Sequence, residues 1–213
     1  MLEDELNKEI RTWWYKLPDS LRANLPNFIH KLNKDAEILF VGLNPSGDVK
    51  KTTVIGEITD EDILLDVEAV YTHIFGNGPK REGQYKRYFK ALSDIAYNLG
   101  KEFDHCDLFH MSYRTSSVIA KEICEGNKLK YKHLNHLRVF KRIFDYISPK
   151  IVITTSVITA NILKDLLDLK LDEESGLYIY KNKTYFYLNG SMSYGRLTEY
   201  DKERMILQIK KIL

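Results

Sequence analysis

The sequence lacks any apolar run that approaches the about 20 residues of a membrane-spanning helix. Its two cysteines, Cys106 and Cys124, lie in no metal-ligand spacing, which predicts a reduced chain with unpaired thiols. The first residues are acidic and helical in pattern, unlike a signal peptide. The chain also has no internal repeat, low-complexity tract or linker. We therefore expect one cytoplasmic domain over residues 1–213, without a membrane anchor, a metal site or another cofactor.

The sequence also has little excess of positive over negative charge. Its net charge is only +2, which does not by itself indicate a nucleic-acid binder. Its distribution is uneven. The segment 57–68 carries six acids and no base, which predicts a solvated helix face, away from DNA or acting as a lid. The segment 121–150 carries eight Lys or Arg against three acids, an excess of +5. This basic segment is either a track for phosphates or ordinary solvated surface.

The most informative stretch is an apolar run over 38–41 followed by a polar turn, Gly42-Leu43-Asn44-Pro45-Ser46-Gly47. The run predicts a strand buried on both faces. The turn cannot continue this strand, because Pro45 has no N–H and the glycines permit backbone angles that other residues avoid. Open α/β sheets bind ligands where a parallel strand ends in such a turn. The alternative is a turn that only ends a core strand.

Hydrophobic periodicity and helix-capping residues predict the remaining elements. We expect helices at 2–17, 19–32, 59–70, 84–99, 134–147, 157–167 and 198–212. Further strands are expected at 106–111 and 151–155, with a hairpin formed by 177–180 and 185–188. This order predicts an α/β fold, a three-layer α/β/α sandwich with a central, mostly parallel four-stranded sheet and a possible extra edge strand from the hairpin.

Aromatic and histidine side chains are assigned mainly to packing. Trp13 and Trp14 are expected in the core rather than stacked on bases. His110 is either a hydrogen-bonded core residue or, with the nearby Cys106 and Asp107, part of a metal site or a nucleophile site. The other histidines of interest, His73, His133 and His136, are expected at the surface.

Two of the turns that follow strands resemble the motifs of a known family. Gly42-Leu43-Asn44-Pro45-Ser46 resembles the first active-site motif of the uracil-DNA glycosylase superfamily, which reads Gly-x-Asn-Pro-Gly in its mismatch-specific and single-strand-selective branches. Asn189-Gly190-Ser191, after the last strand, is similar to the second motif, His-Pro-Ser or Asn-Pro-Ser. Ser46 stands in place of the second glycine and Gly190 in place of the proline.

The resemblance implies an activity and a set of roles. The protein would be a DNA glycosylase that flips a damaged or mismatched pyrimidine out of uracil-containing or mismatched DNA. Catalytic positions would be Asn44, which positions the hydrolytic water, and Asn189. The implied base-binding positions are Gly42, Leu43, Pro45, Ser46, Phe75 (stacking on the base), His110 and Arg114 (reading its edge). The implied DNA-binding positions are Gly190 and Ser191, with Tyr194, Arg196 or Leu197 as the wedge.

The chemistry of base excision suits these residue types. Breaking the N-glycosidic bond develops positive charge on the sugar and negative charge on the leaving base, so the site needs a held water and hydrogen-bond donors. Asn44 can orient water but cannot act as a strong base. Two other functions stay open. One is a nucleic-acid-binding relative without catalysis, and the other is an α/β enzyme that binds a small nucleotide or phosphate with the Ser46–Gly47 amides.

Overall fold

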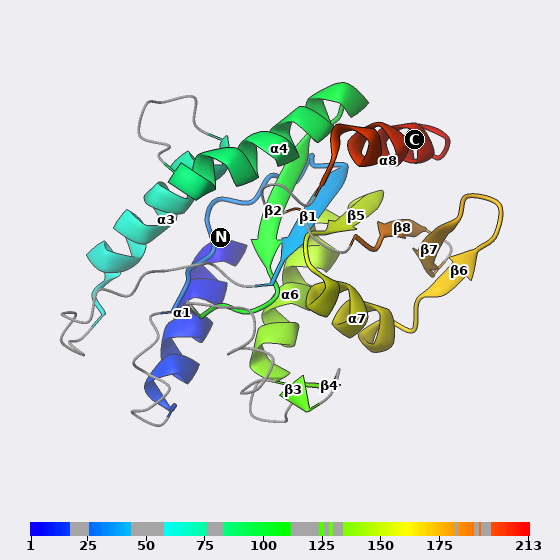
Figure 1. The fold of residues 1–213 in the computed structure, drawn as a ribbon. Helices are drawn as coiled ribbons and strands as arrows, with labels where there is room; N and C mark the ends of the chain where they lie inside the picture. Colours follow the sequence, from blue (N-terminus) through cyan, green and yellow to red (C-terminus); the bar gives the residue numbers. More distant parts are fainter. Residues whose placement is uncertain are drawn as a thin grey trace.

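The structure is a computed structural model that describes residues 1–17, 26–43, 58–75, 83–111, 124–125, 128–129, 134–181, 183–189, 192 and 197–213. Within these ranges six helices surround a mixed six-stranded sheet (Figure 1). The strands of the sheet are β1 (Ile38–Gly42), β2 (Phe103–Asp107), β5 (Ile151–Thr154), β6 (Lys170–Asp172), β7 (Leu177–Tyr180) and β8 (Thr184–Tyr187). The helices are α1 (Leu2–Tyr15), α3 (Asp60–Phe75), α4 (Gly83–Leu99), α6 (Leu134–Ile147), α7 (Val157–Leu166) and α8 (Glu199–Lys210). Two short strands, β3 (Cys124–Glu125) and β4 (Lys128–Leu129), form a separate ribbon.

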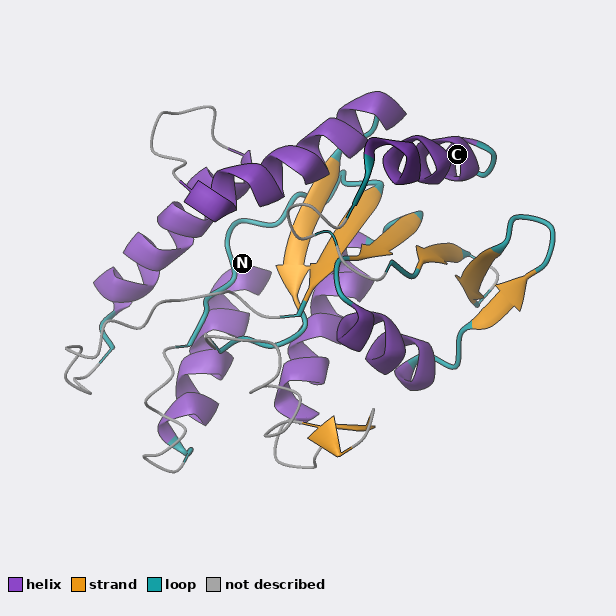
Figure 2. Cartoon of the chain, viewed as in Figure 1, coloured by secondary structure: helices purple, strands orange, loops and turns teal. Residues whose placement is uncertain are grey.

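The strand order is β2-β1-β5-β8-β7-β6. β1 lies between β2 and β5 and runs parallel to both, and β5 runs parallel to β8. β7 and β6 continue the sheet in antiparallel pairing (Figure 2). The α/β class is therefore confirmed, but the sheet has six strands rather than the expected four. Two strands extend the sheet beyond β8: β7 is the hairpin arm expected as a possible edge strand, and β6, where no strand was expected, pairs with β7.

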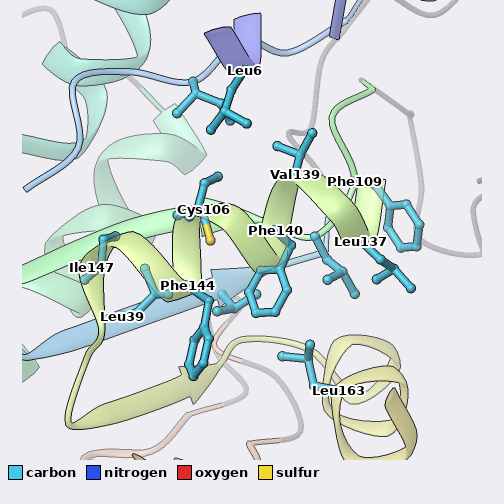
Figure 3. Packing of buried hydrophobic residues seen from close by; sticks show 14 of the residues in the cluster. Leu6, Leu39, Cys106, Phe109, Leu137, Val139, Phe140, Phe144, Ile147 and Leu163 are labelled. Atoms are coloured by element: carbon cyan, nitrogen blue, oxygen red, sulfur yellow. The ribbon is translucent and has the colours of Figure 1, made fainter. Parts of the chain in front are cut away.

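The helices cover the two faces of the sheet (Figure 1). α3, α4 and α8 lie on one face, where their apolar side chains pack against Phe40 and Ile153. α1, α6 and α7 lie on the other face and form the larger apolar cluster with Leu39 and Val152. Figure 3 shows α6 directing Phe140 and Phe144 into this cluster, toward the sheet and α7. The expected burial of Trp13 and Trp14 is confirmed, with 8% and 1% of their surface exposed.

Local capping signals place the helix ends correctly. At the start of α3, Thr59 Oγ1 accepts a hydrogen bond from Asp62 N at 3.1 Å, while the Asp62 carboxylate accepts one from Thr59 N at 2.9 Å. Thr198 and Asp201 cap α8 by the same reciprocal pair. Gly100 follows α4 with φ +64°, the left-handed conformation that glycine adopts without strain.

One expected helix is wrong in its described part, because residues 26–32 form no helix. Side chains from distant elements take the backbone groups that a helix would pair internally. The Asn7 amide donates to the Ile29 carbonyl at 2.9 Å and accepts from the Ile29 N–H at 2.6 Å. A Glu3 carboxylate oxygen accepts from Leu32 N at 3.0 Å. The segment therefore packs as irregular chain held by α1, and Phe28 and Leu32 are still buried.

Three further expectations need correction. The second strand runs over Phe103–Asp107 and not over 106–111, because its register is set by pairing with β1. His136 is buried, with 1% of its surface exposed, where a surface position was expected. On α6, the Arg142 guanidinium forms ion pairs with Glu5 at 2.7 Å and Glu9 at 3.1 Å. This part of the basic segment is thus neutralised by α1 and does not present a free cation to phosphates.

Candidate functional site

The first predicted turn begins at the carboxyl end of β1, and the chain after β2 follows it closely. Leu108 N donates to the Gly42 carbonyl at 3.0 Å, and Phe109 N donates to the Leu43 carbonyl at 2.9 Å. Gly42 is also the strand partner of Asp107. The residues that leave β2 therefore lie directly beside the residues that enter the turn.

The second predicted turn is fastened to the same edge of the sheet through β5. Asn189 N donates to Thr154 Oγ1 at 2.8 Å, and Met192 N donates to the Thr155 carbonyl at 3.2 Å. Thr155 N in turn donates to the Val41 carbonyl at 3.0 Å. Asn189 thus lies two strands from Gly42, about 10 Å away at the usual strand spacing. Gly42 and Asn189, which lead into the two predicted turns, therefore lie at one edge of the sheet although about 150 residues separate them in the sequence.

A chain of polar side chains runs across this edge on the face covered by α4. His105 Nε2 lies 3.2 Å from the Tyr88 hydroxyl, which donates to Thr155 Oγ1 at 2.9 Å. Thr155 Oγ1 donates to the Val41 carbonyl at 3.3 Å. A carbonyl can only accept, so each hydroxyl donates toward Val41 and accepts from the side of His105. His105 must therefore carry its proton on Nε2.

Burial keeps the members of this chain neutral. Desolvation lowers the pKa of His105 to about 3, helped by the charge of His30. Desolvation also raises the pKa of Tyr88 well above its ordinary value, with a further contribution from the negative charge of Asp107. A neutral imidazole and a protonated phenol hold the chain in the single direction that its hydrogen bonds require.

The side chain of Asp107 is the most unusual feature of the site. It is 12% exposed, and no described residue donates a hydrogen bond to its carboxylate. The nearest cationic candidate is His105 Nε2 at 4.0 Å, which is too long for a hydrogen bond. Desolvation without a compensating donor raises the pKa of Asp107 to about 7. Such a carboxylate changes its charge near neutral pH, as a group that transfers protons must.

Gly42 makes room for this carboxylate. A methyl group at position 42 would overlap Oδ1 of Asp107 and lie 3.2 Å from His105 Nε2. The glycine at the end of β1 is thus explained by the close approach of Asp107 and not by an unusual backbone angle. Because Asp107 fills the place of a side chain at position 42, it stands at the entrance of the turn that leads to Asn44.

The structure places the other described candidates as follows. Leu43 is buried in the cluster with α1 and α6. Phe75 packs against Phe103, with ring centroids 5.4 Å apart, and against His30 at 5.9 Å. Phe103 is the first residue of β2, about 13 Å along the strand from Asp107. The ring of Phe75 therefore lies at the other end of the strand from Gly42. Leu197 is half-buried in the cluster that contains Met192.

His110 is fully buried, as the core interpretation predicts, but no described residue forms a hydrogen bond with its ring. Neither ring nitrogen has a hydrogen-bond partner within the described ranges, and burial lowers the pKa of His110 to about 3. Its backbone N–H donates to His136 Nδ1 at 3.0 Å, and the two rings stack 6.0 Å apart. His110 thus offers one donor and one acceptor from a neutral ring, close to the Leu43 turn.

Eight candidate residues lie outside the described residues. They are Asn44, Pro45, Ser46, Arg114, Gly190, Ser191, Tyr194 and Arg196. His73, whose side chain is not described, and His133 are likewise not placed. The site described here therefore consists of the residues that enter and leave the two turns.

Sequence reasoning missed the polar chain and named Asp107 only as a neighbour of His110 in a possible metal or nucleophile site. One signal was present, because the buried strand β2 reads Phe-Asp-His-Cys-Asp and carries three ionisable polar side chains where a buried strand is usually apolar. Tyr88 and Thr155 had no such signal, since they meet only through the fold.

Over the described part of the chain, no three His, Cys, Asp or Glu side chains gather as metal ligands do. None of the described helices is long and apolar enough to cross a membrane. No protein-family model matches the sequence, and no curated protein matches it either.

Proposed function

We propose that this protein is a DNA glycosylase that hydrolyses the N-glycosidic bond of a damaged or mismatched, uracil-type pyrimidine. The observation that carries the proposal is that Gly42 and Asn189, which lead into the two predicted turns, lie at one edge of the sheet, linked through the Asn189–Thr154 and Thr155–Val41 hydrogen bonds. A single flipped base could then touch both turns at once. The parallel strands β2-β1-β5-β8 between two helical layers support a uracil-DNA-glycosylase-like architecture, with β7 and β6 as an added edge.

The polar groups at this edge support the same chemistry. Excision requires a water held at the sugar and hydrogen bonds to the leaving base. Asn44 follows Gly42 by two positions and would hold the water through its amide oxygen. His110 is buried beside Leu43 and has free hydrogen-bonding capacity for the edge of a base. An apolar enclosure around these groups strengthens each hydrogen bond, because water competes less for them.

Incubation with defined oligonucleotides tests the proposal. Single- and double-stranded substrates would carry uracil, a uracil or thymine mismatch, or hypoxanthine, and abasic product would be measured after alkaline cleavage. We expect base release from at least one uracil-type substrate, and a loss of about 100-fold or more in the Asn44→Ala variant. Asn98→Ala is the matched control, because Asn98 lies on the exposed side of α4.

Two other outcomes would identify the alternatives. DNA binding without any abasic product, and with the same affinity in the Asn44→Ala variant, would indicate a non-catalytic nucleic-acid-binding protein. Thermal stabilisation by free nucleotides but not by DNA would indicate a small-ligand enzyme. Either result with folded protein contradicts the glycosylase proposal.

A further inference from the structure

We infer that Asp107 is the group that takes the proton from the attacking water in this hydrolysis. The inference rests on the proposed function and assigns the base that Asn44 cannot supply, because an amide does not accept a proton near neutral pH. Asp107 stands at the carboxyl end of β2 against Gly42, the residue that opens the turn containing Asn44.

The first argument is the hydrogen-bonding state of the carboxylate. Burying a charged carboxylate is costly unless donors compensate it. The Asp107 side chain is 12% exposed, and its nearest charged-group contact among the described residues is His105 Nε2 at 4.0 Å. Among the described residues, no hydrogen-bond donor offsets the cost of burying this carboxylate. A water molecule and a substrate would supply the missing hydrogen bonds.

The second argument is elimination among the described ionisable groups at this edge. His105 uses its Nε2 proton to hold Tyr88. Tyr88 keeps its own proton for Thr155. Cys106 points to the opposite face of the sheet, into the cluster with Leu39, and burial raises its thiol pKa. His110 also has a ring nitrogen with no partner among the described residues, but burial lowers its pKa to about 3, which makes it a poor proton acceptor near neutral pH. Asp107 is then the described side chain at this edge that is best suited to accept a proton.

The reaction balances without any further reactant. The water oxygen bonds to C1′ of the deoxyribose while the bond between C1′ and the base nitrogen breaks, and the bonding electron pair leaves on the base. The proton released by the water passes to the Asp107 carboxylate. Asp107 then returns that proton to the departing base or to solvent, which regenerates the carboxylate. The products are an abasic deoxyribose and the free base.

The surroundings define the expected pH dependence. Among the described residues, the titratable groups that face Asp107 are His105 on its own strand and Tyr88 on α4, while β1 and β5 present Gly42 and Thr155, which do not titrate. Tyr88 and His105 stay neutral across the neutral pH range. Desolvation brings the pKa of Asp107 to about 7, so the reactive carboxylate form increases as the pH rises through neutrality.

The test is single-turnover base release by the wild-type protein and the Asp107→Asn variant, on the substrate that the wild-type protein processes. We expect the variant to be slower by about 100-fold or more, with DNA affinity within about twofold of wild type. The wild-type rate should rise with pH through about 7 and then level off. The residual rate of the variant should lack this rise. Asp94→Asn, an exposed change on α4, is the matched control and should keep the wild-type rate and pH profile.

The possible failures are distinguishable. If the wild-type protein releases no base from any substrate, the proposed function fails and this inference fails with it. If the wild-type protein is active and Asp107→Asn keeps its rate and its pH rise, only the inference is overturned. If the variant loses DNA affinity as much as rate, Asp107 binds the substrate and does not transfer the proton, which also overturns it. Circular dichroism of the variant would exclude loss of folding, and Asp107→Glu, which restores the carboxylate, should regain part of the rate.

Discussion

Two aspartates on β2 are three positions apart and have opposite surroundings. Asp104 is fully buried, and its carboxylate accepts hydrogen bonds from His30 Nε2 at 2.8 Å, His105 N at 2.7 Å and Asn33 N at 2.7 Å. Asp107 is nearly as buried and accepts none from the described residues. A buried acid that the fold requires is surrounded by donors. An acid that lacks described donors, at the strand end where open α/β sheets commonly bind ligands, is the pattern on which the proposed catalytic role of Asp107 rests.

Removing the Asp104 carboxylate tests whether the hydrogen bonds that it accepts stabilise the fold. Asp104→Ala leaves His30 and the N–H of Asn33 without their acceptor, so we expect the free energy of unfolding to fall by about 3–5 kcal/mol. Urea denaturation followed by circular dichroism would measure the loss. The exposed Asp94→Ala variant should lose less than about 0.5 kcal/mol. A loss below about 1 kcal/mol for Asp104→Ala would show that its hydrogen bonds are not needed for the fold.

Replacing Asp107 with a neutral residue should raise the free energy of unfolding, whereas replacing Asp104 should lower it. Its pKa rises from 3.8 to about 7 on folding, so between these pH values the folded protein holds a proton that the unfolded chain has released. Wild-type stability therefore loses an Asp107 contribution of at most about 4 kcal/mol as the pH rises from about 4 to 7. Asp107→Asn lacks this loss and should gain stability relative to wild type over that window.

Urea denaturation of both proteins at pH 5 and pH 8 measures this difference. His105 and His110 act in the opposite direction, because their lowered pKa values favour folding as the pH rises toward 6.5. Both histidines are present in both proteins, so their effect cancels when the two are compared. A stability difference that is the same at pH 5 and pH 8 would contradict the assigned ionisation of Asp107.

The smallest expected effect concerns the contact between Gly42 and Asp107. Gly42→Ala forces the carboxylate away from its position and should lower the free energy of unfolding by about 1–3 kcal/mol. The second substitution, Asp107→Ala, removes the colliding oxygen. Adding Gly42→Ala to Asp107→Ala should then cost less than it does in the wild-type protein, as a double-mutant cycle would measure. If Gly42→Ala lowered the free energy of unfolding equally in both backgrounds, its cost would not arise from the contact with Asp107.

Much of the fold could be predicted from sequence because its signals are local. The helix that Thr198 caps and the strand at 151–154 are defined by neighbouring residues alone. The segment 26–32 shows the limit. Its apolar spacing suits a helix, but Asn7 and Glu3 bind its backbone from more than 20 residues away. A local sequence pattern cannot show that these distant side chains will replace the hydrogen bonds of a helix.

Part of the candidate site could likewise be predicted from local sequence features, and part of it could not. The ends of β1 and β8 just before the small polar residues could be predicted, since a strand that ends in such residues is a local feature. The state of Asp107 could not be predicted, because it depends on what lies around it in three dimensions. His105, Tyr88 and Gly42 come from three different elements, and together they leave the carboxylate without a donor. The family resemblance itself stays a prediction.

The direction of the hydrogen-bond chain has a consequence for the route of protons. The chain from His105 through Tyr88 and Thr155 ends on the Val41 carbonyl oxygen, which has no hydrogen to hand onward. Because the hydrogen-bond chain ends on an acceptor, it cannot carry a proton away from the site. Under the proposed reaction, a proton accepted by Asp107 therefore leaves with the departing base or through the exposed 12% of the Asp107 side chain, so turnover would depend on how quickly solvent reaches that side chain again after each base departs.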